Sequence, residues 1–429
     1  MKNITKRLTL QKKKLDIIKY IFRALTLATV SIFISCHPEP EAQLPTTGKW
    51  HANLELKKGV SLPFIFHLNQ IDSTWTMTIV NGEEEILLED LIFSSDSLKV
   101  TFPVFESALN FKIIDENTLK GEWVNYYKSN DYKLSITAKL GAKNRFDLVG
   151  PVRSVAGKYE VVFSPDTDEE YPAIGLFKQN GSNVTGTFAT ETGDYRHLEG
   201  VVTNDSLKLS TFDGSHAFLF KAAVSDSILA GTFWSGSHFK ENWTAKINPQ
   251  AKLRNADSLT YLNPGFEKMS FTFPDATGKM VSLEDKQFKN KPVIVQIMGS
   301  WCPNCLDETR YLSSLYKKYN SSGLEIIALA FERTTNKEKA LENLKNLKVK
   351  TGADYTFLLG GATRDDKAEE KLQMLNHIMS YPTALFIDKS GEIRRIHTGF
   401  YGPSTGKYYE DFKVKTEHLV EEMLNEKLD

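Results

Sequence analysis

Two cysteines stand close together in "GSWCPNC", residues 299–305, with two residues between Cys302 and Cys305. A pair with this spacing can be a redox centre, half of a metal site, or a structural pair. The apolar run at 293–298 predicts a buried strand before the pair, and residues 303–319 have helical spacing. A helix N-terminus favours a thiolate, so this junction indicates a redox centre. Cys302 would attack, and Cys305, one turn further in, would resolve the mixed disulfide.

The motif "WCPNC" at 301–305 after an apolar strand, with "YPT" at 381–383 before a later strand, resembles the thioredoxin fold. It is most similar to the TlpA/ResA type of membrane-tethered thiol-disulfide oxidoreductase. The resemblance covers about residues 264–429, and the leading segment 271–283 and Glu308 fit the same pattern. It implies that a redox-active Cys302–Cys305 disulfide takes the place of any bound cofactor.

The same resemblance implies which other residues act at the site. Pro382 is expected to form a cis peptide bond that places the Tyr381 backbone against the cysteines, as an edge for an extended substrate. The residues expected to contact substrate are Trp301, Pro303, Asn304, Tyr381 and Thr383.

Resolution of the mixed disulfide needs a base that deprotonates Cys305. Thioredoxins keep a buried acid six residues before the first cysteine, but that position here is Gln296, which cannot accept a proton. Glu332 matches a position where the ResA type keeps an acid, and we take it as the candidate catalytic base. The alternative is a solvated glutamate at a strand end, beside Arg333.

The region around the cysteines alternates between strand and helix patterns, which predicts an α/β domain over residues 264–429 after a linker at 251–263. We expect strands at 293–298, 324–331, 355–359, 383–388 and 392–398, helices at 303–319, 336–347 and 366–378, and after the last strand a final helix up to Glu426.

The region before the linker is duplicated. Gly48-Lys49-Trp50 matches Gly157-Lys158-Tyr159, and Asp96-Ser97-Leu98-Lys99 matches Asp205-Ser206-Leu207-Lys208, each pair 109 residues apart. Short segments of period two and turn signals such as Asn81-Gly82 predict two all-β units, 48–147 and 153–250. The eight candidate strands between Gly48 and Leu140 would suit an up-and-down barrel or a flattened sandwich. Such a unit is either a spacer or a binding site for a partner or ligand.

The first 35 residues combine a lysine-rich start with an apolar run, which indicates an export signal rather than a membrane-spanning helix. Cys36 follows in "FISC", which resembles a lipoprotein signal and makes Cys36 the candidate lipidation site, with 36–47 as a tether. The sequence therefore predicts a protein on the periplasmic side of the cell envelope, anchored to a bacterial membrane by lipid. Its expected partners are protein disulfides and a membrane thiol electron donor. A net charge of -1 argues against nucleic acid.

Three alternatives remain at this point. A peroxiredoxin would need Pro-x-x-x-Thr-x-x-Cys, but Val295 and Gly299 occupy those positions. A metal-handling module would use the two cysteines with His397 or His377, although copper-delivery relatives space their cysteines by three residues. In the third alternative, the β repeats carry the main function as a binding protein.

Overall fold

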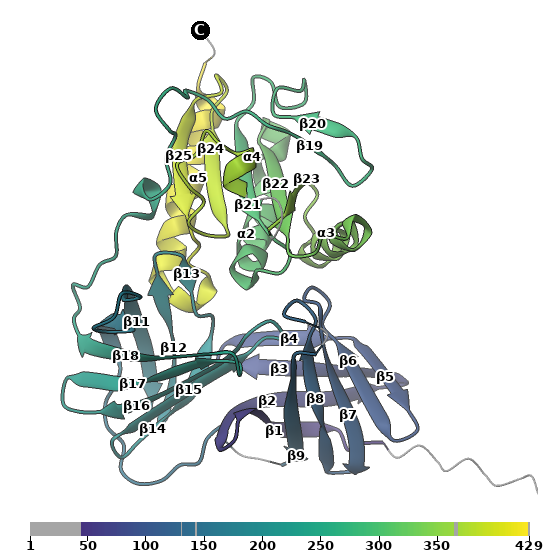
Figure 1. The fold of residues 1–429 in the computed structure, drawn as a ribbon, viewed down its shortest axis with the longest axis vertical. Helices are drawn as coiled ribbons and strands as arrows, with labels where there is room; N and C mark the ends of the chain where they lie inside the picture. The colour runs from purple at the N-terminus through teal and green to yellow at the C-terminus, as the bar shows by residue number, and fades with distance from the viewer. Residues whose placement is uncertain (1–43, 130, 142–143, 364–367, 428–429) are drawn as a thin grey trace, which may run out of the picture. The chain divides into compact units, whose positions relative to one another are not determined.

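Residues 48–140 form a nine-stranded antiparallel sheet in the order β4-β3-β2-β1-β9-β8-β7-β6-β5, so that β4 and β5 are its two edges. The computed structural model describes residues 44–129, 131–141, 144–363 and 368–427, so the predicted signal and Cys36 lie outside the described residues (Figure 1). The strands are β1 (Gly48–Lys57), β2 (Val60–Ile71), β3 (Thr74–Asn81), β4 (Glu84–Leu88), β5 (Asp90–Ser94), β6 (Ser97–Thr101), β7 (Ser107–Asp115), β8 (Thr118–Asn125) and β9 (Lys133–Leu140).

The second copy, residues 157–247, repeats this arrangement. Its strands are β10 (Gly157–Phe163), β11 (Tyr171–Asn180), β12 (Asn183–Thr190), β13 (Gly193–Asp194), β14 (Leu198–Thr203), β15 (Ser206–Phe212), β16 (Ala217–Val224), β17 (Ile228–Ser235) and β18 (Phe239–Ile247). In β1 the side chains at alternate positions, Trp50, Ala52 and Leu54, are buried. This is the period of two residues on which the strand predictions were based. The expected all-β, barrel-like repeats are confirmed.

The two copies differ in how the sheet closes. In the second copy β11 pairs with both β10 and β12, and β12 pairs with β14, so the barrel is closed. In the first copy, residues 84–94 form two strands, β4 and β5, and β4 pairs along β3 from Met77 to Asn81. β4 therefore occupies the edge of β3 that β5 would need, and this sheet is only nearly closed.

The C-terminal domain has a five-stranded sheet in the order β23-β22-β21-β24-β25, parallel for the first three strands and antiparallel for the last two. On β21, Ile294 and Met298 join the core that contains the helices, while Val293, Val295 and Ile297 join a core with the leading segment. A strand buried on both faces explains the continuous apolar run. The elements are β19 (Thr272–Pro274), β20 (Met280–Ser282), β21 (Val293–Met298), α2 (Pro303–Tyr319), β22 (Glu325–Glu332), α3 (Lys337–Thr351), β23 (Thr356–Ala362), α4 (Ala368–Lys371), β24 (Thr383–Ile387), β25 (Ile393–Thr398) and α5 (Lys407–Asn425), with short 3-10 turns at Ala256–Ser258, Asn320–Ser322 and Pro403–Thr405.

The helix predicted at 366–378 is wrong in its second half. The described helix α4 ends at Lys371, and the following residues pair with the linker instead. Leu375 forms a β-bridge with Leu262, and the Asn263 amide donates to the Met374 carbonyl at 2.8 Å. These tertiary backbone hydrogen bonds replace those that a helix would have supplied.

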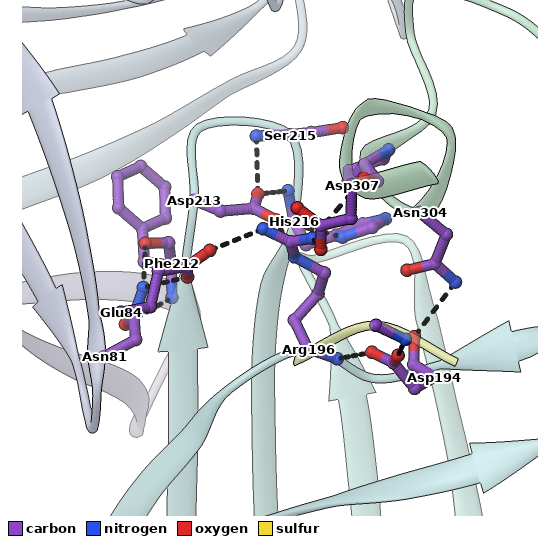
Figure 2. A network of polar contacts seen from close by, with 12 residues as sticks. Asn81, Glu84, Asp194, Arg196, Phe212, Asp213, Ser215, His216, Asn304 and Asp307 are labelled. Atoms are coloured by element: carbon purple, nitrogen blue, oxygen red, sulfur yellow. Dashed lines mark hydrogen bonds and ion pairs between the residues drawn. The ribbon is translucent and has the colours of Figure 1, made fainter. Parts of the chain in front are cut away.

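A buried arginine connects the repeats to the helix that carries the cysteines (Figure 2). Arg196, between β13 and β14, is 2% exposed and contacts Glu84 of the first repeat, Asp213 of its own repeat and Asp307 of α2. Burial opposes the guanidinium charge, yet the surrounding carboxylates raise the pKa of Arg196 above its ordinary value. Arg196 also donates to the Pro303 carbonyl at 3.3 Å. One side chain thereby joins three parts of the chain.

Replacing Arg196 with methionine is expected to remove the cation that Glu84, Asp213 and Asp307 all contact. We expect the free energy of unfolding to fall by about 3–5 kcal/mol, measured as a shift in the guanidinium unfolding curve. The matched control is Arg153→Met in the same repeat, because Arg153 is 43% exposed and pairs with Asp205 and Asp226. That change is expected to cost less than about 1 kcal/mol, and equal losses in both variants would contradict the prediction.

Candidate active site

Cys302 and Cys305 lie at the junction of β21 and α2, where the sequence placed them. Cys302 is the N-cap of α2, and its Sγ accepts the Cys305 amide at 3.2 Å. Cys302 is 7% exposed, whereas Cys305 is fully buried, and both are free thiols. Burial raises the pKa of Cys305 well above its ordinary value, and the hydrogen bond with Cys302 raises it further. The outer sulfur can therefore react while the inner one stays a protonated thiol.

The loop before β24 faces the outer sulfur. The Tyr381-Pro382 bond is cis, as the resemblance implied, and the Cys302 thiol donates to the Tyr381 carbonyl at 3.3 Å. Trp301 packs on Tyr381 with ring centroids 5.5 Å apart. Thr383 is turned away from the cleft, because it is fully buried and its hydroxyl donates to the Ser380 carbonyl at 2.8 Å.

Glu332 is fully buried, so it is not the solvated glutamate of the alternative interpretation. Its carboxylate accepts the Ser300 amide at 2.8 Å and the Ser300 hydroxyl at 2.6 Å. Burial raises the pKa of Glu332 to about 7. The first repeat reaches the same turn, because the Tyr127 hydroxyl lies 3.4 Å from the Ser300 hydroxyl. Glu332 thus holds the residues that lead into the cysteine motif.

A second buried acid lies on the inner side of the pair. Glu308 follows Cys305 by one helical turn, and its charge contributes to the raised pKa of Cys305. Gln296 donates to Glu308 Oε2 at 2.9 Å and to the Cys305 carbonyl at 3.3 Å. Burial raises the pKa of Glu308 to about 8, and its Oε1 has no hydrogen-bond partner within the described residues. Glu308 is therefore placed to exchange a proton at Cys305.

The outer sulfur opens into a cleft of about 720 Å³. Trp301, Pro303 and Asn304 line it as the sequence predicted, but the opposite wall comes from the β repeats. Residues 190–195 form the longest continuous stretch of this wall. The cleft residues from the repeats include Lys128, Thr192, Asp194, Tyr195, His216 and His238.

The turn that leads from β12 to β14 contacts three segments around the cysteines. Asn304 donates to the Asp194 carbonyl at 3.3 Å, and the Ser380 hydroxyl donates to the Thr192 carbonyl at 2.6 Å. The Gly402 amide donates to the Asp194 carboxylate at 2.5 Å. Asn304 therefore binds the repeat as well as facing the cleft.

Sequence reasoning missed the residues that the repeats contribute. At the offset of 109 residues, Arg196 corresponds to Leu87, which is 50% exposed. A charged residue where the other copy has leucine is a weak signal of divergence between copies. Only burial identifies Arg196 as a connecting residue, and burial is a property of the tertiary structure.

The histidines of the metal alternative have other partners. His397 Nδ1 lies 2.6 Å from Asp257, and His377 Nδ1 lies 2.5 Å from the Asn376 amide nitrogen. In the part of the chain that the structure describes, His, Cys, Asp and Glu side chains form no group of three that could hold a metal ion.

A cysteine pair at the start of the helix after a central strand, opposite a cis-proline, defines a thioredoxin-like domain. Residues 265–410 match the family model Redoxin. The chain is 32% identical over 129 residues to "Thiol-disulfide oxidoreductase ResA" of Bacillus thuringiensis subsp. konkukian (strain 97-27), covering 30% of this chain and 66% of that protein. It is 25% identical over 138 residues to ResA of Bacillus subtilis (strain 168), covering 32% and 69%. The C-terminal region is thus a thioredoxin-like oxidoreductase domain of the TlpA/ResA type.

Solved structures with similar folds include a thioredoxin-family thiol:disulfide interchange protein from Chlorobium tepidum TLS. It shows 22% identity and a TM-score of 0.29, covering 41% of this chain and 100% of that one. A secreted thiol-disulfide isomerase from Corynebacterium glutamicum shows 15% identity and a TM-score of 0.30, covering 40% and 98%. The aligned part spans 66% of the first curated relatives' own length. Of the helices formed by described residues, none is long and apolar enough to cross a membrane.

The two buried acids give the stability of the protein a defined pH dependence. Because the pKa values of these two acids are raised in the folded state, their carboxyl groups hold more protons in the folded protein than in the unfolded chain between pH 4.5 and about 8. Their contribution to the free energy of unfolding therefore falls as pH rises through this range. Glu308→Gln removes the contribution of Glu308. Between pH 5 and pH 9, the free energy of unfolding of the variant is therefore expected to fall by less than that of the wild type, and the difference is on the order of 3 kcal/mol.

Guanidinium unfolding at a series of pH values measures this difference between variant and wild type. Glu85→Gln serves as the control, because the Glu85 side chain is exposed. A Glu308→Gln curve parallel to that of the wild type over the whole range would show that the buried carboxyl titrates normally.

Proposed function

We propose that this chain is an extracytoplasmic thiol-disulfide oxidoreductase that reduces protein disulfides through Cys302 and Cys305. The observation that carries the proposal is the outer sulfur at the helix N-terminus, against the Tyr381 carbonyl, with the inner sulfur buried behind it. The ResA relatives, named thiol-disulfide oxidoreductases, support this choice of reaction. We also propose that a lipid on Cys36 anchors the protein to the membrane, and that a membrane thiol donor supplies the electrons that reduce Cys302 and Cys305.

The reaction follows from the different surroundings of the two sulfurs. The Cys302 thiolate attacks one sulfur of the substrate disulfide, forming a mixed disulfide and releasing the other substrate sulfur as a thiolate. Cys305 then loses its proton and attacks the Cys302 sulfur. The second substrate thiolate leaves, and the protein keeps a Cys302–Cys305 disulfide. Two electrons pass to the substrate, and an external dithiol must return them.

The structure favours Glu308 over Glu332 as the acceptor of the Cys305 proton. Glu308 acts electrostatically on Cys305 and shares Gln296 with it, whereas both oxygens of Glu332 bind Ser300. We therefore propose Glu308 as the base for Cys305 and Glu332 as the acid that positions the turn before Cys302. This revises the role that sequence matching gave to Glu332.

The binding-protein alternative separates the repeats from the redox chemistry. The repeats instead line the cleft in front of Cys302 and bind the residues around it. This arrangement supports one site built by both regions.

The direction of electron flow is tested by the redox equilibrium of residues 37–429 in dithiothreitol buffers, followed by thiol labelling and Trp301 fluorescence. A reductant is expected to show a two-electron potential near that of thioredoxin, roughly -270 mV. A value near about -120 mV would assign a disulfide-forming oxidant instead. Failure to form the Cys302–Cys305 disulfide would overturn the proposed function.

The two acids are distinguished by the rate at which a preformed mixed disulfide resolves. Glu308→Gln is expected to slow resolution at least about tenfold at pH 7, and the wild-type rate is expected to rise with pH toward about 8. Glu332→Gln should have the smaller effect. The Cys305→Ser variant provides the unresolved reference. A slow Glu332→Gln variant beside a normal Glu308→Gln variant would return the role of base to Glu332.

A further inference from the structure

A histidine of the second repeat lies in the cleft into which the outer sulfur opens. His216, the residue before β16, lines this cleft together with Cys302. The residues next to these two are in contact, because the Ser215 hydroxyl donates to the Trp301 carbonyl at 3.5 Å. The turn that carries His216 is therefore held beside the residue that precedes Cys302.

The imidazole ring of His216 is held in one orientation (Figure 2). It stacks on Phe218, with the ring centroids 4.3 Å apart and the planes inclined by 22°. Its Nδ1 is buried and lies 3.3 Å from Asp213 Oδ2, and neither atom has a hydrogen-bond partner elsewhere among the described residues. The side chain is 29% exposed. Because Nδ1 is buried, Nε2 is the nitrogen that remains to face the cleft.

Asp213 is itself fixed and negatively charged. Its Oδ1 accepts the amides of Ser215 and His216 at 2.8 and 2.6 Å, and its Oδ2 lies 3.6 Å from Arg196 Nε. Burial opposes the charge of Asp213, yet His216 and Arg196 hold the pKa of its carboxyl below its ordinary value. A carboxylate beside one nitrogen of an imidazole orients the ring and leaves the other nitrogen to exchange a proton.

The other histidine that lines the cleft has different surroundings. His238 Nε2 lies 2.7 Å from the Lys128 ammonium. Burial and the charge of Lys128 lower the pKa of His238 to about 4, so His238 is not an imidazolium at pH 7. His216 faces a carboxylate where His238 faces a cation, and this difference favours His216 as the proton donor of the cleft.

Resting on the proposed function, we propose that His216, oriented by Asp213, is the general acid that protonates the sulfur leaving the substrate disulfide. Such a group assists disulfide exchange, because a sulfur leaves more slowly when the pKa of its thiol is high. An imidazolium held in front of the reacting sulfurs supplies a proton to the leaving one. The second repeat thereby contributes a catalytic residue to the reaction of the thioredoxin-like domain.

One bond forms and one breaks in this step. The Cys302 thiolate bonds to the nearer substrate sulfur, and the electron pair of the substrate S–S bond passes to the farther sulfur. The proton on Nε2 of the His216 imidazolium moves to that sulfur, which leaves as a thiol, and His216 becomes neutral. The solvent returns a proton to His216 before Cys305 displaces the second substrate sulfur.

The test compares two uncharged disulfides that differ in how well their sulfur leaves. Bis-hydroxyethyl disulfide releases an alkyl thiolate, whereas the aromatic rings of dithiodipyridine delocalise the charge on the leaving sulfur. In single-turnover reduction at pH 7, His216→Gln is expected to lower the second-order rate constant at least about tenfold with the alkyl disulfide and less than about twofold with the aromatic one. A variant that had lost structure would slow both reactions, so the ratio of the two rates isolates the proton transfer.

Three further variants assign the effect to the pair of side chains. In His216→Ala, added imidazole is expected to restore the rate with the alkyl disulfide, because it replaces the missing ring as the proton donor. Asp213→Asn is expected to shift the ratio in the same direction as His216→Gln, since asparagine keeps an oxygen for the two amides but lacks the charge that orients the ring. His418→Gln is the control and should leave both rates unchanged, because His418 on α5 is 73% exposed.

The outcomes separate this inference from the function on which it rests. If His216→Gln slows both disulfides equally, or slows neither, the general acid is overturned and the oxidoreductase function stands. If the wild type reduces neither disulfide, the proposed function itself fails. A loss confined to the alkyl disulfide, together with rescue of His216→Ala by imidazole, supports the inference.

Discussion

The buried ion pair between Arg196 and Asp307 is the constraint on which the site depends. A guanidinium that is 2% exposed requires carboxylates around it, and these come from the first repeat, the second repeat and the helix that begins at the cysteines. Because the same arginine donates to the Pro303 carbonyl between the two cysteines, its position fixes the repeats against the first turn of that helix (Figure 2).

The two sulfurs differ because the protein surrounds them differently. Cys302 receives a backbone amide at the helix end and faces the cleft, whereas Cys305 lies among buried side chains with Glu308 one turn away. Burial keeps the inner thiol protonated until the outer sulfur has reacted. The repeats add to the site, because their residues line the cleft into which the outer sulfur opens.

Local sequence pattern predicted most elements of the fold. The apolar run before the cysteines became β21 with the predicted bounds, and the helical spacing after them became α2. The pattern failed where tertiary hydrogen bonds replaced local ones. Leu375 pairs with the linker instead of continuing a helix. This pairing depends on a partner distant in sequence, which periodicity does not register.

The sequence by itself determined the redox pair, its place at a strand-to-helix junction, the duplication, and the thioredoxin-like character of the last domain. These follow from residue types and spacings along one stretch of chain. Only the tertiary structure decided that the repeats line the cleft, that Glu308 and Glu332 are both fully buried, and that Arg196 is buried among carboxylates. Burial and long-range electrostatics set these outcomes, and both arise when distant segments pack together.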